Sequence, residues 1–338
     1  MAAGPWRTRL AWILSAAGIG LIAILALRVS WSGVLSALRG LSLPWLLGAL
    51  TLAIASVSMR ALRLAVVLGQ TSAVAKIWRS VCLGYFGSLF LPLGGGELVK
   101  VAALHRLTGL SLPRVGTALA MDRMFDVATL LALLLSVLGQ GTLSTLRPGP
   151  VLVLVTGGAV LIALLLFLVV SGSHLRNRLL RWARRHPGRH AWIRRFDEIH
   201  DQTLALRKPM LLPKLGLLQA CIFSLDILAA WCCLLAFPFG TGLPATAALR
   251  LAFFSMVAFG VPLLPGGLGS HQAASILALA PFGIGATQAL AVSLAGEASH
   301  VAALSFLGIL AMVGSGLNPF RLSRQPEVLD SPHPSEEP

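Results

Sequence analysis

The sequence predicts an all-α polytopic membrane protein with about six full spans plus two re-entrant hairpins arranged as an inverted repeat. Of the 338 residues, 56% are apolar, and the mean hydropathy is +0.83. Only 12% of the residues are charged, about half the share in a typical soluble domain. A soluble globular protein cannot bury so much apolar surface, and apolar stretches of about 20 residues, the length that crosses a bilayer, recur along the chain.

Six apolar stretches are predicted to form full transmembrane helices. They are residues 10–27, 43–68, 115–139, 150–171, 212–237 and 287–315. The first stretch follows Arg7 and Arg9 and therefore resembles a signal peptide. Because no small-x-small cleavage site follows at the expected place, we expect this stretch to remain as the first span.

Two further apolar stretches are interrupted in the middle. Residues 78–105 are broken by a Leu-Pro-Leu-Gly-Gly-Gly-Glu sequence that starts at Leu91, and residues 247–281 by a Leu-Pro-Gly-Gly-Leu-Gly sequence that starts at Leu264. Proline removes a helical hydrogen-bond donor, and glycine favours irregular backbone. Irregular backbone at membrane depth is tolerated only where protein buries it or where it lines a wet cavity. Both stretches are therefore predicted to be hairpins.

The distribution of basic residues predicts the topology. The loop 172–214 has eleven Lys and Arg against three acids, so we expect it in the cytoplasm. The stretch 78–105 then enters the membrane from the inside and returns, whereas 247–281 enters from the outside and returns. This arrangement places 21 Lys and Arg at the inner side and four at the outer side. It predicts a multi-pass protein of the cell membrane with both termini in the cytoplasm.

The same loop predicts a lipid partner. Trp182 and Trp192 lie among its arginines, a pattern typical of a helix that rests on anionic headgroups. Binding of nucleic acid is the poorer explanation of this charge, and none is predicted. The sequence leaves open whether the chain forms a homo-oligomer.

The two broken stretches align without a gap at an offset of 173 residues, the distance from Phe86 to Phe259. The alignment also pairs Pro92 with Pro265 and places glycines on glycines. The repeat halves are then about 43–139 and 216–315, and the charge bias gives them opposite orientations. The transmembrane domain is expected to cover 1–320, followed by a disordered acidic tail at 321–338. Broken helices in corresponding places of two inverted halves favour a transporter with a site near the midplane.

In the first half, two charged residues follow the break and three lie in the next span. Glu97 and Lys100 are three residues apart just after the break, so they are predicted to share a helix face and to pair. The alternative is that Glu97 only caps this helix. Asp122 and Asp126 also share a face, and Arg123 could reach Glu97 or a lipid phosphate, which its fork fits well. A purely structural ion pair remains the alternative for these three.

In the second half, His271 and Gln272 follow the glycine run, and Glu297 and His300 lie in the next span. Each histidine could be a packing residue or a proton relay. Glu297 and His300 are two candidate metal ligands without a third, so no metal and no cofactor are predicted. The role of Asp226, in span 212–237, stays open.

The motifs resemble the flippase-like transmembrane region of the lysylphosphatidylglycerol synthase family. Its first pattern, an aromatic or Asn-rich segment, then Pro, then Gly-Gly-Asp-x-x-Arg, corresponds to Phe90 through Lys100. Its Glu-Arg with an acid three residues later corresponds to Asp122 through Asp126. Its Pro-x-Gly-Gly-Leu-Gly-x-x-Glu pattern corresponds to Leu264-Pro265 through Gln272, and an Arg-x-x-Arg pattern to Arg60 and Arg63. The resemblance covers residues 10–320. Here Gln272 stands where the family usually has Glu, which puts a proton-coupled role at this position in doubt.

The resemblance and the intramembrane polar residues together predict the following substrate-binding set: Arg60, Arg63, Pro92, Gly94, Gly95, Gly96, Glu97, Lys100, Asp122, Arg123, Asp126, Pro265, Gly266, Gly267, Gly269, His271, Gln272, Glu297 and His300. The function implied is a lipid translocator for an anionic or polyprenyl-linked lipid. The alternatives are a transporter of a small soluble anion or sugar, and a non-catalytic membrane subunit of a lipid-synthesis system. No nucleophile–base pair, nucleotide loop or aminoacyl-transfer domain is found, so we expect no enzyme activity.

Overall fold

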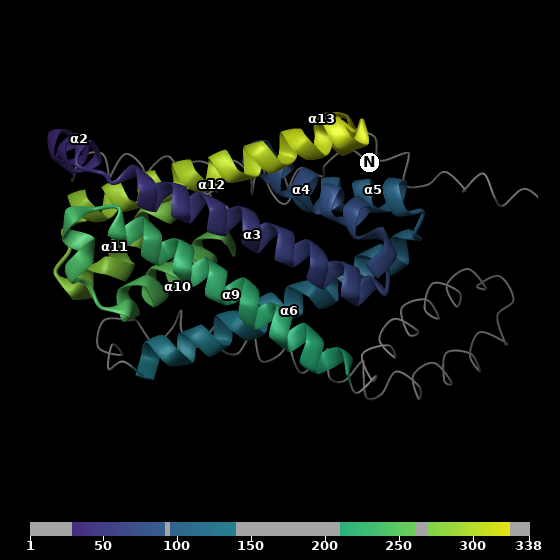
Figure 1. Cartoon of the computed structure of the whole chain (residues 1–338), viewed down its shortest axis with the longest axis horizontal. Coiled ribbons are helices and arrows are strands. Elements are labelled where there is room, and N and C mark those ends of the chain that lie inside the picture. The colour runs from purple at the N-terminus through teal and green to yellow at the C-terminus, as the bar shows by residue number, and fades with distance from the viewer. Residues whose placement is uncertain (1–28, 92–94, 140–209, 261–268, 325–338) are drawn as a thin grey trace, which may run out of the picture. The chain divides into compact units, whose positions relative to one another are not determined.

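The computed structural model describes residues 29–91, 95–139, 210–260 and 269–324, and these are helical without a strand among them (Figure 1). The predicted spans 10–27 and 150–171 lie outside the described residues, as does the loop 172–214 up to residue 209. The tail beyond residue 324 and five of the predicted site residues also lie outside the described residues. These five are Pro92, Gly94, Pro265, Gly266 and Gly267.

Four long helices coincide with predicted spans. They are α3 (Leu43–Leu68), α6 (Leu112–Gly139), α9 (Leu211–Leu235) and α12 (Ala286–Ser315). Among the described residues, α3, α9 and α12 are long and apolar enough to cross a membrane. Helix α6 has 28 residues, but Asp122, Arg123 and Asp126 interrupt its apolar sequence. Gly316, with φ of +67°, ends α12 in the left-handed conformation that glycine adopts at low cost.

Shorter helices form the rest of the described chain. The two broken stretches become α4 (Val74–Phe90) with α5 (Gly95–Thr108), and α10 (Ala245–Gly260) with α11 (Ser270–Leu279). Helices α2 (Trp31–Arg39) and α13 (Pro319–Arg324) flank the long helices, and α13 includes the first four residues of the expected tail. Three turns of 3₁₀ helix complete the structure: η1 (Thr71–Ala73), η4 (Pro238–Gly242) and η6 (Ala280–Phe282).

The chain divides into two compact units, which are described separately. Unit 1 comprises residues 1–57, 82–100 and 223–323, and unit 2 comprises 58–81, 101–222 and 324–338. The boundaries between the units fall within α3, α4, α5, α9 and α13.

In unit 1, antiparallel helix pairs provide the framework. Helix α3 runs beside α9, where the Ser42 amide donates to the Ala236 carbonyl at 2.7 Å and Ser56 Oγ donates to Asp226 at 2.5 Å (Figure 1). Helix α10 packs against α11, and Ser270 Oγ donates to the Ala258 carbonyl at 3.4 Å. Helix α11 also packs on α12, which in turn packs on α2.

Glycines bring α4 and α5 together within unit 1. A Cβ added at Gly84 would lie 2.7 Å from the Lys100 Cβ, and one added at Gly96 would lie 2.7 Å from the Ser88 amide nitrogen. These distances leave no room for a side chain, so the two helices touch backbone to backbone. The glycines that the sequence places on both sides of the break therefore set the spacing of the pair.

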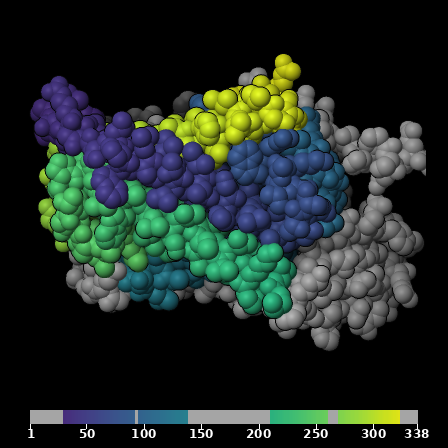
Figure 2. Space-filling model, in the orientation of Figure 1, coloured from purple at the N-terminus to yellow at the C-terminus, as the bar shows by residue number. Residues whose placement is uncertain are grey.

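Exposed apolar side chains cover the outer surfaces of the long helices. In unit 1, Trp45 and Leu47 of α3 are 44% and 52% exposed, and in unit 2 Leu217 of α9 is 67% exposed. Figure 2 shows the face on which α3 and α9 present these surfaces. An apolar exterior of this kind suits contact with lipid.

Candidate functional site

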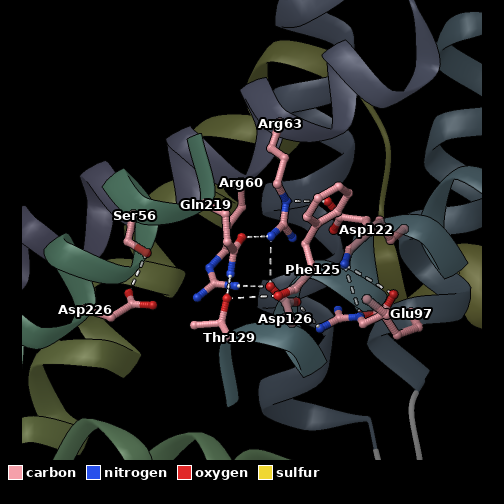
Figure 3. Close-up of polar contacts among 12 residues, drawn as sticks. Ser56, Arg60, Arg63, Glu97, Asp122, Phe125, Asp126, Thr129, Gln219 and Asp226 are labelled. Atoms are coloured by element: carbon pink, nitrogen blue, oxygen red, sulfur yellow. Dashed lines mark hydrogen bonds and ion pairs between the residues drawn. The ribbon is translucent and has the colours of Figure 1, made fainter. Parts of the chain in front are cut away.

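A buried polar cluster in unit 2 is centred on Arg63 of α3 (Figure 3). Its side chain has no exposed surface. Arg63 Nε donates to Asp122 Oδ1 at 2.7 Å, and Nη1 donates to Asp126 Oδ1 at 3.0 Å. Asp122 and Asp126 lie one turn apart on α6, so a single guanidinium reaches both carboxylates. We call Arg60, Arg63, Asp122, Arg123 and Asp126 the unit 2 ion cluster.

Two neutral residues, Gln219 and Phe125, contact the guanidinium of Arg63. Gln219 of α9 accepts a hydrogen bond from Arg63 Nη1 and donates from Nε2 to Thr129 Oγ1 at 2.5 Å. The Arg63 guanidinium also lies over the ring of Phe125, 5.9 Å from its centroid. Gln219 was not among the predicted site residues, although an uncharged amide within an otherwise apolar span was a signal that pointed to it.

The ion cluster has more cations than anions. Arg60 Nη1 donates to Asp126 at 3.2 Å, and Arg123 Nη1 donates to the same carboxylate at 3.3 Å. Among these five residues, three guanidinium groups therefore face two carboxylates. Arg63 Nη2 is buried and has no hydrogen-bond partner in the described chain. This donor suits a phosphate or carboxylate oxygen.

The structure adds to the roles expected within this cluster. Arg123 donates to Asp126, and 45% of its side chain is exposed. The expected contact of Arg123 with Glu97 or a lipid phosphate stays a prediction. Arg63, which entered the predicted set only through the family pattern, is the buried centre. The acidic pair shares a face as predicted.

In unit 1, the predicted pair at the start of α5 is present. Lys100 Nζ donates to the two carboxylate oxygens of Glu97 at 3.0 and 3.2 Å. The Lys100 side chain is 3% exposed and Glu97 is 44% exposed, and the ammonium also lies 4.9 Å from the Tyr85 ring centroid. Glu97 lies in the first turn of α5, where a negative charge also interacts well with the helix dipole. Gly95 and Gly96 precede the pair in the same helix.

A second polar group in unit 1 connects α11 to α12. Gln272 accepts a hydrogen bond from the Gly269 amide at 2.6 Å and donates to Glu297 at 2.5 Å. The rings of His271 and His300 contact Phe259, with centroids 4.3 and 5.1 Å away. The described residues contain no group of three His, Cys, Asp or Glu that could hold a metal ion.

Asp226, whose role the sequence left open, has a defined neighbour. It accepts a hydrogen bond from Ser56 on α3 (Figure 3). The contact joins two long helices of unit 1, which indicates a role in packing.

The comparisons with known proteins agree with these motifs. No curated protein matches the chain significantly. A family model described as the lysylphosphatidylglycerol synthase TM region matches residues 11–308. The match includes the helices that carry the unit 2 ion cluster and both polar groups of unit 1. The chain therefore belongs to the family of the lysylphosphatidylglycerol synthase transmembrane region.

Proposed function

We propose that the protein is a lipid translocator that moves an anionic or polyprenyl-linked lipid between the leaflets of the cell membrane. The observation that carries the proposal is the unit 2 ion cluster, in which a buried guanidinium with an unused donor lies with two further arginines around two carboxylates. An ion at the centre of a bilayer costs about 2.5–3.5 kcal/mol on insertion scales. A fixed cationic cluster lowers that cost for a headgroup that carries negative charge.

The lengths of the helices support two re-entrant hairpins. Helices α4, α5, α10 and α11 have 17, 14, 16 and 10 residues. At 1.5 Å per residue they are about 15–26 Å long, which is shorter than the roughly 30 Å hydrocarbon core. In this proposal each pair enters the membrane and returns to the same side.

The order of the helices supports an inverted repeat. The offset of 173 residues moves α4 to 247–263 and α5 to 268–281, close to α10 and α11. The same offset moves α6 to 285–312, close to α12. Each half thus reads long helix, short pair, long helix. In this proposal the halves have opposite orientations and the termini are cytoplasmic, an arrangement typical of transporters built from inverted repeats.

In this proposal the polar residues bind and do not catalyse. The arginines of the ion cluster take the phosphate, and Lys100 offers a further donor. The acyl or prenyl tails remain in the surrounding lipid. Membrane lipids are therefore the proposed partners, and no cofactor is required.

A leaflet-exchange assay tests the proposal. The purified chain is reconstituted in vesicles that contain headgroup-labelled phosphatidylglycerol, phosphatidylcholine or a polyprenyl phosphate, and a membrane-impermeant quencher reports how much label reaches the outer leaflet. We expect faster exchange of one of the two anionic lipids and loss of that acceleration in Arg63→Lys, which keeps the charge but loses the fork. Arg321→Gln, which removes an exposed cation of α13, is the control. Folded wild-type protein that accelerates no lipid refutes the proposal.

The same vesicles separate the alternatives. Uptake of a radiolabelled soluble anion or sugar without lipid exchange would identify a solute transporter. If neither movement occurs but deletion of the gene changes the cellular lipids, the chain would act as a subunit of a lipid-synthesis system.

A further inference from the structure

Arg250, a residue outside the candidate site, is a buried cation of α10. Its side chain is 1% exposed. Nε donates to the Ala278 carbonyl of α11 at 3.3 Å, and the guanidinium lies 5.8 Å from the centroid of the Phe254 ring. Nη1 is buried and has no hydrogen-bond partner among the residues that the structure describes.

The charge of Arg250 is not neutralised by the described part of the chain. The buried cations Arg63 and Lys100 each pair with a carboxylate, whereas no acid forms an ion pair with Arg250. One carbonyl and one aromatic face compensate only part of the desolvation of a guanidinium. Since the buried Nη1 loses its hydrogen bonds to water, an anion is the partner that would restore the balance.

The position of Arg250 is suited to a headgroup. It is the sixth residue of α10, about 8 Å along the axis from the first residue, Ala245. Its carbonyl partner, Ala278, lies in the last turn of α11. Pro281 follows and cannot donate an amide proton back to that helix. Arg250 therefore lies where the start of α10 meets the last turn of α11, at a depth from which arginine side chains reach the interface.

We infer that Arg250 binds a phosphate group at this end of the α10–α11 pair, in a site distinct from the unit 2 ion cluster. The guanidinium keeps its bond from Nε to Ala278, while Nη1 donates to a phosphate oxygen. The phosphate belongs either to an anionic lipid or to inorganic phosphate, since both offer the same oxygens. Because protein atoms cover Nη1, a neighbouring side chain moves when the phosphate binds. The site does not depend on whether the protein moves lipids between leaflets.

Three ligands distinguish the two sources. The full-length protein in a neutral detergent is titrated with phosphatidylglycerol, phosphatidylcholine or inorganic phosphate, and thermal unfolding and native mass spectrometry measure binding. We expect phosphatidylglycerol, but not phosphatidylcholine, to raise the melting temperature. If inorganic phosphate raises the melting temperature as much as phosphatidylglycerol does, the soluble anion is the ligand.

Substitutions separate anion binding from helix packing. Arg250→Gln can still donate to the Ala278 carbonyl but has no charge, so we expect its affinity for the stabilising anion to fall about tenfold or more. Arg250→Lys keeps the charge without the fork and should lose less. Arg321→Gln should bind as the wild type does. If Arg250→Gln lowers the melting temperature but keeps the same anion-dependent increase, Arg250 only joins the two helices and the inference is wrong.

A measurement on the wild type covers the case in which the variants do not fold. Phosphatidylglycerol with a photoactivatable headgroup is cross-linked to the protein, with inorganic phosphate present or absent, and the modified peptides are identified. The site is supported if residues near Arg250 are labelled and if excess unlabelled phosphatidylglycerol or phosphate suppresses this labelling. Either of two results would overturn the inference. One is labelling confined to other parts of the chain, and the other is that no phosphate-bearing ligand stabilises the wild type.

Discussion

Substitution of Arg63 by Met tests whether the unit 2 ion cluster is one coupled unit. The change removes the donors that Asp122 and Asp126 accept at 2.7 and 3.0 Å. Asp126 keeps Arg60 and Arg123, but Arg63 is the one ion-pair partner of Asp122 in the described chain. Removal of one partner of a buried pair costs about 3–5 kcal/mol because the other charge stays buried without compensation. We expect a loss of this size in the free energy of unfolding.

A double-mutant cycle gives the decisive measurement. Asp122→Asn alone leaves Arg63 bound to Asp126 and should cost about 1–3 kcal/mol. Asp122→Asn in the Arg63→Met background removes the stranded charge, so the double variant should lose less than the sum of the two single losses by about 1–3 kcal/mol. The free energies come from unfolding by sodium dodecyl sulfate in mixed micelles. Additive losses, within about 0.5 kcal/mol, would refute the coupling between Arg63 and Asp122.

Two further substitutions test the hairpin and the α11–α12 contact. Gly96→Ala should destabilise the protein by about 1–3 kcal/mol, because its Cβ would lie 2.7 Å from Ser88 atoms, whereas Gly116→Ala, with nothing within 4 Å, should be neutral or slightly stabilising. Thermal unfolding of the two variants side by side checks this, and equal melting temperatures would argue against the close backbone contact. Gln272→Leu should cost about 1–3 kcal/mol because Glu297 loses its amide donor. Faster amide hydrogen exchange at the start of α11 would report the change, and an unchanged exchange rate would contradict it.

Much of the fold follows from the sequence because apolar length and proline–glycine breaks are local signals. The span predicted at 43–68 has the bounds of α3, and the bounds of α9 and α12 differ from the predictions by one or two residues. The i, i+3 spacing of Glu97 and Lys100 likewise predicted a contact within one helix turn, which the structure contains.

The partners of the site residues were less predictable, since contacts between helices depend on the packing of distant segments. The sequence shows that Asp122 and Asp126 share a face, but not which cation lies opposite. Arg63 is 59 residues from its partner Asp122 and 156 residues from its partner Gln219. Arg123 lies beside the acids in sequence, but sequence neighbours on a helix point in different directions, so the sequence alone does not show that Arg63 is the buried centre.

The pairing of Arg63 with the acids of α6 has a consequence for biogenesis. Helix α6 does not meet the criteria by which α3, α9 and α12 could cross a bilayer, and each of its three central charges opposes release from the translocon into lipid. The ribosome delivers α3 first, so the guanidinium of Arg63 is already present when the two carboxylates emerge. Partitioning of α6 into the bilayer should therefore depend on α3, and a nascent chain that lacks Arg63 should leave α6 outside the lipid more often.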